Sequence, residues 1–128
     1  MIVVDAGCLF EVVTNRDGAI DLADRLATDA TAAPHIIDVE VLGVIRRELM
    51  LGRLDPSSAR RAIDRTIVWG GERFAHRSLL ERAWQLRDNV RGWDAMYVAL
   101  AEVLDATLIT KDHRLAAANG PRCPIEVF

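Results

Sequence analysis

Two short apolar runs that each lead into an aspartate constrain the fold more than any other feature of this chain. Residues 2–4 read IVV and are followed by Asp5, and residues 107–110 read TLIT, with Asp112 two positions later. Short apolar, β-branched runs suit strands that are buried on both faces, as in a parallel sheet covered by helices. Parallel strands present their carboxyl ends at one edge of the sheet. We therefore expect the two acids to emerge at the same edge, within side-chain reach of each other if the strands are neighbours.

Helical signals fill most of the chain between these runs. The predicted helices, which show apolar spacing or terminal capping residues, cover residues 18–30, 38–52, 55–71, 78–89 and 93–104. Asp38 and Asp55 are assigned as N-caps, and Ala33-Pro34 is interpreted as a break in the chain. A last apolar run at 125–128 predicts another strand. Strands that alternate with helices predict an α/β fold with a central parallel sheet.

Length and composition indicate one globular domain, residues 1–128. The chain has 51% hydrophobic and 27% charged residues, which excludes a disordered chain, and 128 residues are too few for two ordinary domains. The first residues show neither a basic segment nor a long apolar one, so we expect a cytoplasmic protein with no membrane segment. Cys8 and Cys123 lack the spacing of a zinc site, and we expect reduced, buried thiols.

The charge balance gives no general signature of nucleic-acid binding. The formal net charge is -3, and the cations are fifteen arginines and one lysine, Lys111. Six of the arginines fall in a single stretch: Arg46, Arg47, Arg53, Arg60, Arg61 and Arg65. Two interpretations of this stretch are open, a solvated helical face and a surface that contacts phosphates.

Two further acids lie where helices are expected to begin. Asp94 falls in the first turn of a helix that is apolar nearly all round, and Glu40 falls early in the helix that follows Pro34. A carboxylate in a buried helix needs a partner, because an unpaired buried charge is costly. Each acid taken alone has a purely structural interpretation, as an N-cap or as a favourable charge at the positive end of a helix dipole.

Four acids at one sheet edge favour a chemical interpretation over four separate structural ones. Carboxylates that converge repel one another and raise one another's pKa unless a cation lies between them. Oxygen ligands select Mg²⁺ or Mn²⁺ over zinc, and the three histidines, His35, His76 and His113, show no ligand spacing. Acidic sites of this kind suit phosphodiester hydrolysis, in which the metal activates water and orients the phosphate.

At this point the sequence resembles a known family, the PIN-domain ribonucleases of the VapC type, which are the toxin halves of bacterial type II toxin–antitoxin pairs. Four segments carry the resemblance in the family's order: IVVDA at 2–6, Glu40 in its helix, WDAMYVALAE at 93–102 and LITKDHRL at 108–115. The last two segments together are the specific ones. The resemblance extends over essentially the whole chain.

The resemblance implies a PIN-like three-layer α/β/α fold and a metal-dependent endoribonuclease. It makes Asp5, Glu40, Asp94 and Asp112 a catalytic quartet that binds Mg²⁺ or Mn²⁺ and activates water for RNA cleavage. Asp5 and Asp94 would be the principal metal ligands, and Thr110 would support the site. Members usually act as homodimers on structured or single-stranded RNA, often tRNA or ribosomal RNA. A cognate VapB-like antitoxin silences them by placing its tail in the acidic cleft.

One position departs from the family pattern. Gly7 stands where the family commonly has a serine, so this chain lacks a hydroxyl near the metal. A weakly active or inactive PIN module that binds RNA or antitoxin is therefore kept as the alternative. Lys111 suggests a phospho-acceptor receiver domain as another alternative. Such a domain needs a paired acid near the first strand, and this sequence does not show one.

Large apolar side chains are assigned to the core by default. Trp69, Trp84 and Trp93 are expected to be buried unless the structure shows them exposed. The amphipathic stretch 55–69 is interpreted as a helix that packs on the sheet, with part of an antitoxin groove as its alternative. The apolar residues whose helical spacing suits burial in the core are Ala59, Ala62, Ile63 and Ile67.

Overall fold

The computed structural model describes residues 1–16 and 19–128, and these residues form a parallel sheet between helices. The strands are β1 (Ile2–Val4), β2 (Thr31–Pro34), β3 (Glu72–Phe74), β4 (Thr107–Thr110) and β5 (Ile125–Val127). All neighbours pair in parallel, and the order across the five-stranded sheet is β3-β2-β1-β4-β5. The predicted parallel sheet is confirmed, and β1 and β4 are neighbours in it, which meets the condition for Asp5 and Asp112 to approach each other.

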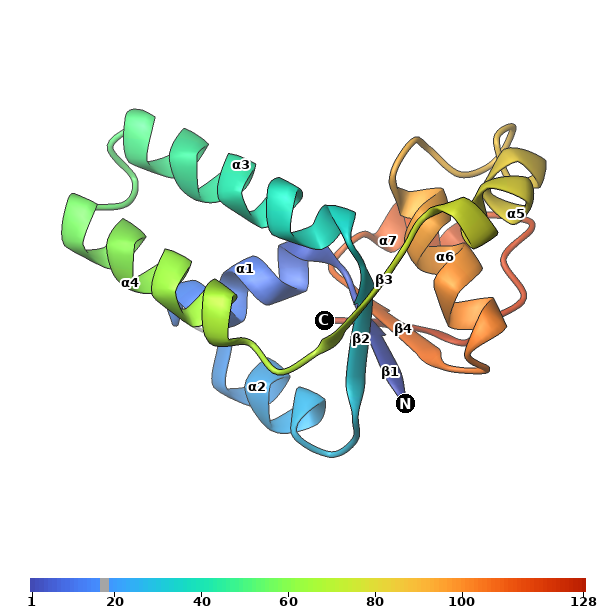
Figure 1. Ribbon diagram of the computed structural model, residues 1–128, viewed down its shortest axis with the longest axis horizontal. Helices are drawn as coiled ribbons and strands as arrows, with labels where there is room; N and C mark the ends of the chain where they lie inside the picture. The colour runs from blue at the N-terminus through green and yellow to red at the C-terminus, as the bar shows by residue number, and fades with distance from the viewer. Residues whose placement is uncertain (17–18) are drawn as a thin grey trace.

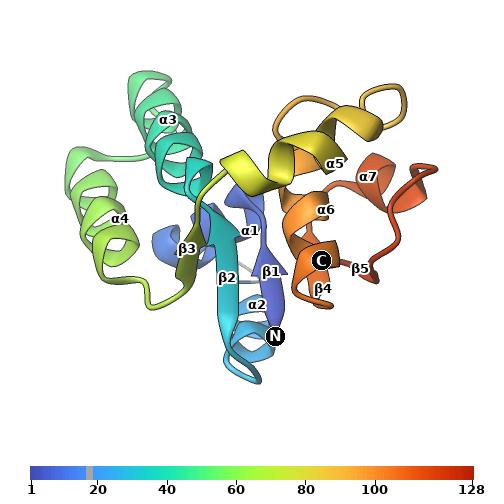
Figure 2. The same ribbon diagram turned by 45° about the vertical axis from the view of Figure 1, so that its right-hand side comes forward.

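Helices cover both faces of this sheet. They are α1 (Ala6–Thr14), α2 (Ala19–Leu26), α3 (Ile36–Met50), α4 (Pro56–Val68), α5 (Leu80–Gln85), α6 (Asp94–Val103) and α7 (His113–Ala117), with a 3-10 turn, η1 (Arg77–Leu79), before α5. Figures 1 and 2 show α1 to α4 on one side of the sheet and α5 to α7 on the other. The predicted three-layer α/β/α architecture is confirmed.

The strand order places a switch in chain direction between β1 and β4. From β1 the chain moves outward to β2 and β3, and it then crosses back to place β4 and β5 on the other side of β1. In open α/β sheets the functional crevice lies at such a point, beyond the carboxyl ends of the strands. Val4 pairs with Ile109 in this register, and the Asp5 N–H donates to the Ile109 carbonyl at 3.2 Å. The two central strands thus stay side by side as far as the acids.

The core lies on both faces of the central strands. Val3 and Val4 on β1 and Ile109 on β4 are fully buried, and Leu9 on α1 packs in the same cluster. Helix α6 is buried along most of its length from Ala95 to Ala101, as its apolar sequence predicts. None of the helices in the described part of the chain combines the length and the apolar character that a bilayer crossing requires.

The segment between the first two strands differs from its prediction. A helix was predicted over 18–30; its start at Gly18 lies outside the described residues, and α2 ends at Leu26, four residues early. Ala33-Pro34 was interpreted as a break in the chain, but these two residues belong to β2, which pairs with β1 and β3. Pairing with strands distant in sequence provides these hydrogen bonds, and no local pattern reveals it.

The start of α3 also differs, because its cap comes from a distant residue. Asp38 was assigned as the N-cap, but the helix begins two residues earlier, at Ile36. The Ile36 N–H donates to Nε2 of His76, 40 residues away, at 2.9 Å. Asp38 instead lies in the first turn and forms an ion pair with Arg73 at 2.9 Å. The Asp55 cap on α4 is confirmed, since its carboxylate accepts the Ser58 N–H.

Two of the three tryptophans do not enter the core. Trp84 is 64% exposed and Trp93 is 61% exposed, whereas Trp69 is partly buried. The predicted helix over 78–89 is the shorter pair of η1 and α5. Its segment buries Leu79 and Leu86, which lie one to two turns apart, so Trp84 faces outward.

Helix α4 packs as an outer element rather than on the sheet. It contacts α1 and α3 through Ala59 and Ala62, which are buried as predicted. Ile67 was expected in the core but is exposed, and it borders an open groove between α3 and α4. Cys8 is a buried free thiol, as expected, and Cys123 is a half-buried one.

The distant cap on α3 gives a stability prediction. His76→Ala should lower the free energy of unfolding by about 1 kcal/mol, because the Ile36 N–H loses its acceptor. Chemical denaturation of both variants measures the change. His35→Ala is the matched control, since this exposed histidine contributes no side-chain cap. Equal losses of stability in the two variants would contradict the capping role.

Candidate active site

Asp5 is held rigidly where β1 turns into α1. Its carboxylate is the N-cap of α1 and accepts the Cys8 N–H at 2.7 Å. The other carboxylate oxygen accepts a hydrogen bond from the Thr110 hydroxyl at the end of β4. Two donors on two elements therefore fix the orientation of this carboxylate at the sheet edge.

Thr110 connects Asp5 with Asp112. Its side chain is fully buried, and its hydroxyl accepts the Asp112 N–H at 2.9 Å while it donates to Asp5. Asp112 then caps α7 by accepting the Arg114 N–H at 2.8 Å. Asp5 and Asp112 therefore each cap a helix and also lie at the carboxyl edge of the sheet, so the two positions predicted for them are compatible.

Glu40 is positioned by a tyrosine from the opposite layer. The Tyr97 hydroxyl on α6 donates to the Glu40 carboxylate on α3, across the crevice. Tyr97 is 1% exposed. Burial, followed by the hydrogen bond to Glu40, raises the pKa of the Tyr97 hydroxyl well above its usual range. The hydroxyl therefore remains a proton donor to Glu40 at any physiological pH.

Asp94 completes the group from the first residue of α6. Burial raises the pKa of Asp94, the charges of Asp112 and Asp5 raise it further, and Arg91 opposes the shift. Burial likewise raises the pKa of Glu40; the Tyr97 hydrogen bond lowers it, and the charges of Asp94 and Asp5 raise it. These couplings show that the four predicted acids share one electrostatic environment.

The acids line two adjoining hollows. Asp5, Glu40 and Asp94 line an open pocket of about 420 Å³ with Tyr97, and Asp94 also borders a smaller one beside Asp112. Asp94 is common to both. The structure therefore brings Asp5, Glu40 and Asp94 to one pocket and places Asp112 at its margin.

The donor set fits a hard divalent cation, although the side chains are not gathered into a cage. Among residues 1–16 and 19–128, no three histidine, cysteine, aspartate or glutamate side chains lie close enough together to hold a metal ion. Asp5, Glu40 and Asp112 each accept hydrogen bonds from donors of the protein itself. Their like charges also keep the carboxylates apart when no cation lies between them. The oxygen-only chemistry and the pocket that the acids share suit Mg²⁺ or Mn²⁺.

The space beside Asp5 bears on the departure at Gly7. A Cβ atom at Gly7 would lie 3.5 Å from the Asp5 carboxylate, which is an ordinary contact. The glycine is therefore not required by close packing, and a hydroxyl-bearing side chain would fit there. Behind Asp5, burial and then the Asp5 charge raise the pKa of the Cys8 thiol far above its usual range, so Cys8 is not a nucleophile.

Two residues of this pocket were not predicted to lie beside the acids, although Arg47 was named from the sequence as part of the arginine-rich stretch. Tyr97 lies three residues after Asp94, one helical turn along, and Arg47 lies seven residues after Glu40, two turns along. Helical spacing from the two acids could have identified both, because side chains one or two turns apart share a face. Nothing local shows that the faces of α3 and α6 meet.

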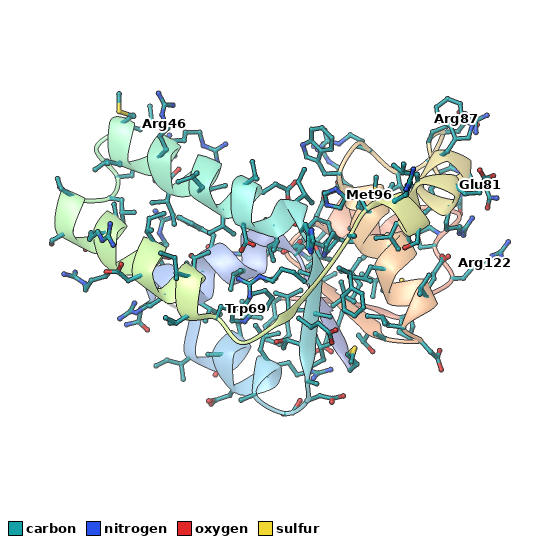
Figure 3. The ribbon with its side chains drawn as sticks, in the orientation of Figure 1. Arg46, Trp69, Glu81, Arg87, Met96 and Arg122 are labelled. Atoms are coloured by element: carbon teal, nitrogen blue, oxygen red, sulfur yellow. The ribbon has the colours of Figure 1, made fainter. Side chains whose placement is uncertain are left out.

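Most arginines of the 46–65 stretch form ion pairs or hydrogen bonds within the chain. Arg60 pairs with Asp64, Arg61 contacts Ser58, and Arg65 donates to a carbonyl of α1. Arg46 extends from α3 away from the rest of the molecule (Figure 3). These contacts favour the solvated-face interpretation for most of the stretch, with Arg47 in the pocket as the exception.

Other proteins are similar to this chain in sequence. A model of the PIN domain matches residues 2–121. Ribonuclease VapC1 from Mycobacterium tuberculosis is 39% identical over 127 residues, which is 98% of this chain and 96% of that protein. Ribonuclease VapC9 from the same organism is 36% identical over 99% of this chain and 98% of its own length.

Solved structures show the same fold at lower identity. PAE2754 from Pyrobaculum aerophilum has a TM-score of 0.70 at 23% identity, over 98% of this chain and 83% of that chain. VapBC2 from Rickettsia felis, bound to a DNA fragment from its promoter, has a TM-score of 0.72 at 14% identity, over 100% of this chain and 99% of that chain. A toxin-antitoxin complex from Klebsiella pneumoniae has a TM-score of 0.66 at 17% identity, over 99% of this chain and 97% of that chain.

The mutual repulsion of the acids predicts how stability depends on pH without metal. A carboxyl whose pKa is raised by folding stabilises the fold below its ordinary pKa, and that contribution is lost as pH rises through the raised value. For Glu40 and Asp94 this loss begins above about pH 4. In EDTA the melting temperature should be higher at about pH 5.5 than at pH 7.5, by a few degrees.

Replacing one acid isolates the cause of that pH dependence. Asp94→Asn should raise the melting temperature at pH 7.5 in EDTA and reduce the difference between the two pH values, because it removes one of the repelling charges. Asp24→Asn, on an exposed face of α2, is the matched control and should change neither. A lower melting temperature for Asp94→Asn than for the control would contradict the repulsion.

The Tyr97 contact predicts an effect on cation affinity. Tyr97→Phe keeps the ring and removes the donor to Glu40, so the affinity for Mn²⁺ should fall by roughly 10- to 100-fold. Calorimetric titration with Mn²⁺ measures this. Thr66→Val on α4 removes another buried hydroxyl, which bonds only within its own helix, and should leave the affinity unchanged. An unchanged Mn²⁺ affinity in a folded Tyr97→Phe protein would exclude the positioning role.

Proposed function

Because this chain belongs to the PIN-domain family and to its VapC branch, we propose that it is a Mg²⁺- or Mn²⁺-dependent endoribonuclease, the toxin of a toxin–antitoxin pair. The observation that carries the proposal is the placement of Asp5, Glu40 and Asp94 around one pocket at the switch point of the sheet. Asp112 joins them through the Thr110 hydroxyl.

The proposed chemistry assigns a role to each acid. Asp5 and Asp94 would hold the cation directly, and Glu40 and Asp112 would complete its surroundings. The chemistry supplied by the bound cation is neutralisation of charge, orientation of the scissile phosphate and activation of water. Glu40 has a raised pKa and a fixed orientation, which suit a group that accepts a proton from the attacking water.

The supporting residues keep these acids in place during the reaction. Thr110 fixes one oxygen of Asp5, and within residues 1–16 and 19–128 no arginine or lysine forms an ion pair with this carboxylate. Tyr97 does the same for Glu40. Lys111, the only lysine of the chain, is held at 2.8 Å by Glu11 at the side of the site. The acidic pocket thus keeps its negative charge available for a cation.

The partners follow from the same proposal. We propose a VapB-like antitoxin, whose tail enters the acidic cleft, a homodimer of this chain, and tRNA or ribosomal RNA as substrate, all in the cytoplasm. Relatives whose structures are toxin–antitoxin assemblies support the first partner. Exposed Leu42 and Ile67 border a groove between α3 and α4 with half-buried Ile63, and this apolar surface suits the antitoxin.

One experiment tests the proposed activity. The purified protein should cut a total RNA pool into defined fragments with Mg²⁺ or Mn²⁺ and should not do so with EDTA. Asp94→Asn should reduce the cleavage rate by about 100-fold or more, because the charge that holds the cation is lost. Asp24→Asn is the matched control and should cleave at the rate of the unchanged protein.

The other outcomes separate the alternatives. Fragments that persist in EDTA and with Asp94→Asn would contradict the proposal. Intact RNA together with measurable Mn²⁺ binding would favour the weakly active PIN module, which the missing hydroxyl at Gly7 motivates.

A further inference from the structure

Beside the acids lies a hollow with cations on its margin. Asp94 and Asp112 border it on one side, and Arg91 and Arg114 border it with them. Both arginines are exposed, and within the described part of the chain neither guanidinium forms an ion pair. The charge of Arg91 reaches Asp94, whose pKa it lowers. Two free cations therefore flank the acids, while most arginines of the 46–65 stretch are engaged elsewhere.

A second hollow continues from the first and is apolar and aromatic. It shares Arg91 with the first hollow, and its other borders include Leu80, Trp84, Arg87 and Met96. Val90 and Arg91 border both hollows, which connects this hollow with the one that Asp94 and Asp112 line. Figure 3 shows Met96 near the upper end of α6 and Arg87 beyond the end of α5.

Trp84 gives this hollow a large exposed aromatic surface. The side chain is 64% exposed, and exposed Leu80 lies one turn before it on α5. The Arg87 guanidinium stacks over the ring at 4.4 Å from its centroid and donates to the Trp84 carbonyl at 2.9 Å. A ring anchored from one side by a cation, with most of its surface open, is suited to stack against another π-system.

We propose that the two hollows form a subsite for a single-stranded nucleotide next to the scissile phosphate, which rests on the ribonuclease function proposed above. Arg91 and Arg114 would hold a flanking phosphate, and the base would stack on Trp84 against Leu80 and Met96. The substrate class is RNA with an unpaired base beside the cleavage position, because a base inside a duplex cannot reach an aromatic side chain.

Charge complementarity selects RNA over a second copy of this chain as the occupant. The net charge of the chain is -3, while Arg91 and Arg114 beside this surface form no ion pair within the described residues and can contact phosphates. This surface places Arg87 against the aromatic ring, and Arg91 borders both this hollow and the one beside the acids. A polyanion with flat bases matches both features, whereas an identical acidic chain matches only the apolar part.

Equilibrium binding of short RNA tests the subsite. The assay uses Asp94→Asn as the parent, so that cleavage does not intervene, and three labelled probes: hexa-adenylate, hexa-uridylate and an abasic ribose-phosphate hexamer. Trp84→Ala should weaken hexa-adenylate binding roughly 5- to 100-fold, and Trp84→Phe should retain most of it, because a phenyl ring still stacks. Binding of the abasic probe should be unchanged by either substitution.

The contribution of Arg91 to RNA affinity can be measured separately from that of Trp84. Arg91→Gln should weaken all three probes by a similar factor and reduce the slope of log affinity against log salt by about 0.7, as expected for one lost phosphate contact. Arg122→Gln, on the loop before β5, is the matched control for loss of an exposed arginine and should change neither quantity.

Two results would contradict the subsite without contradicting the nuclease proposal, which the RNA cleavage assay tests. Trp84→Ala that binds hexa-adenylate as tightly as the parent would overturn it, as would equal weakening of the abasic probe. Sedimentation of the parent and of Trp84→Ala shows whether this surface binds a second copy of the chain. If Trp84→Ala converts a dimer to a monomer and its weaker RNA binding follows only from that change, the surface is an interface between copies.

Discussion

The hydroxyl of Thr110 is the contact on which the arrangement of this molecule depends. It joins the carboxyl ends of the two central strands by donating to Asp5 on one and accepting the Asp112 N–H on the other. Parallel pairing of β1 with β4 brings the two segments together, and the buried hydroxyl sets the side-chain geometry beyond the last pair. Without this bridge, strand pairing would still place Asp5 and Asp112 at the same edge, but one oxygen of Asp5 would lose its donor.

The same site opposes the stability of the fold in the absence of a cation. Burial and neighbouring charges raise the pKa values of Glu40 and Asp94, so their ionised forms at neutral pH cost free energy. The buried strands and α6 supply the stability that keeps these groups in place. A cation that binds among the acids would remove the repulsion, so we expect binding and folding to be coupled.

The sequence predicts the acids better than it predicts the elements that orient them. Short apolar runs identify β1 and β4, and an apolar helix identifies α6, because burial on all sides leaves a local signal. Strand β2 and the true start of α3 leave none, since they depend on pairing with β1 and on His76. Trp84 was misplaced for the same reason: which face of a short helix is buried depends on α6, not on its own residues.

The central claim is that Asp5, Glu40 and Asp94 form the binding site of a divalent cation. Crystals grown with Mn²⁺ and measured for its anomalous scattering test this directly. The account predicts an anomalous peak within about 2.5 Å of carboxylate oxygens of Asp5 and Asp94, with Glu40 still bonded to Tyr97. Manganese bound elsewhere while this pocket stays without a peak, at a concentration that supports RNA cleavage, would contradict it.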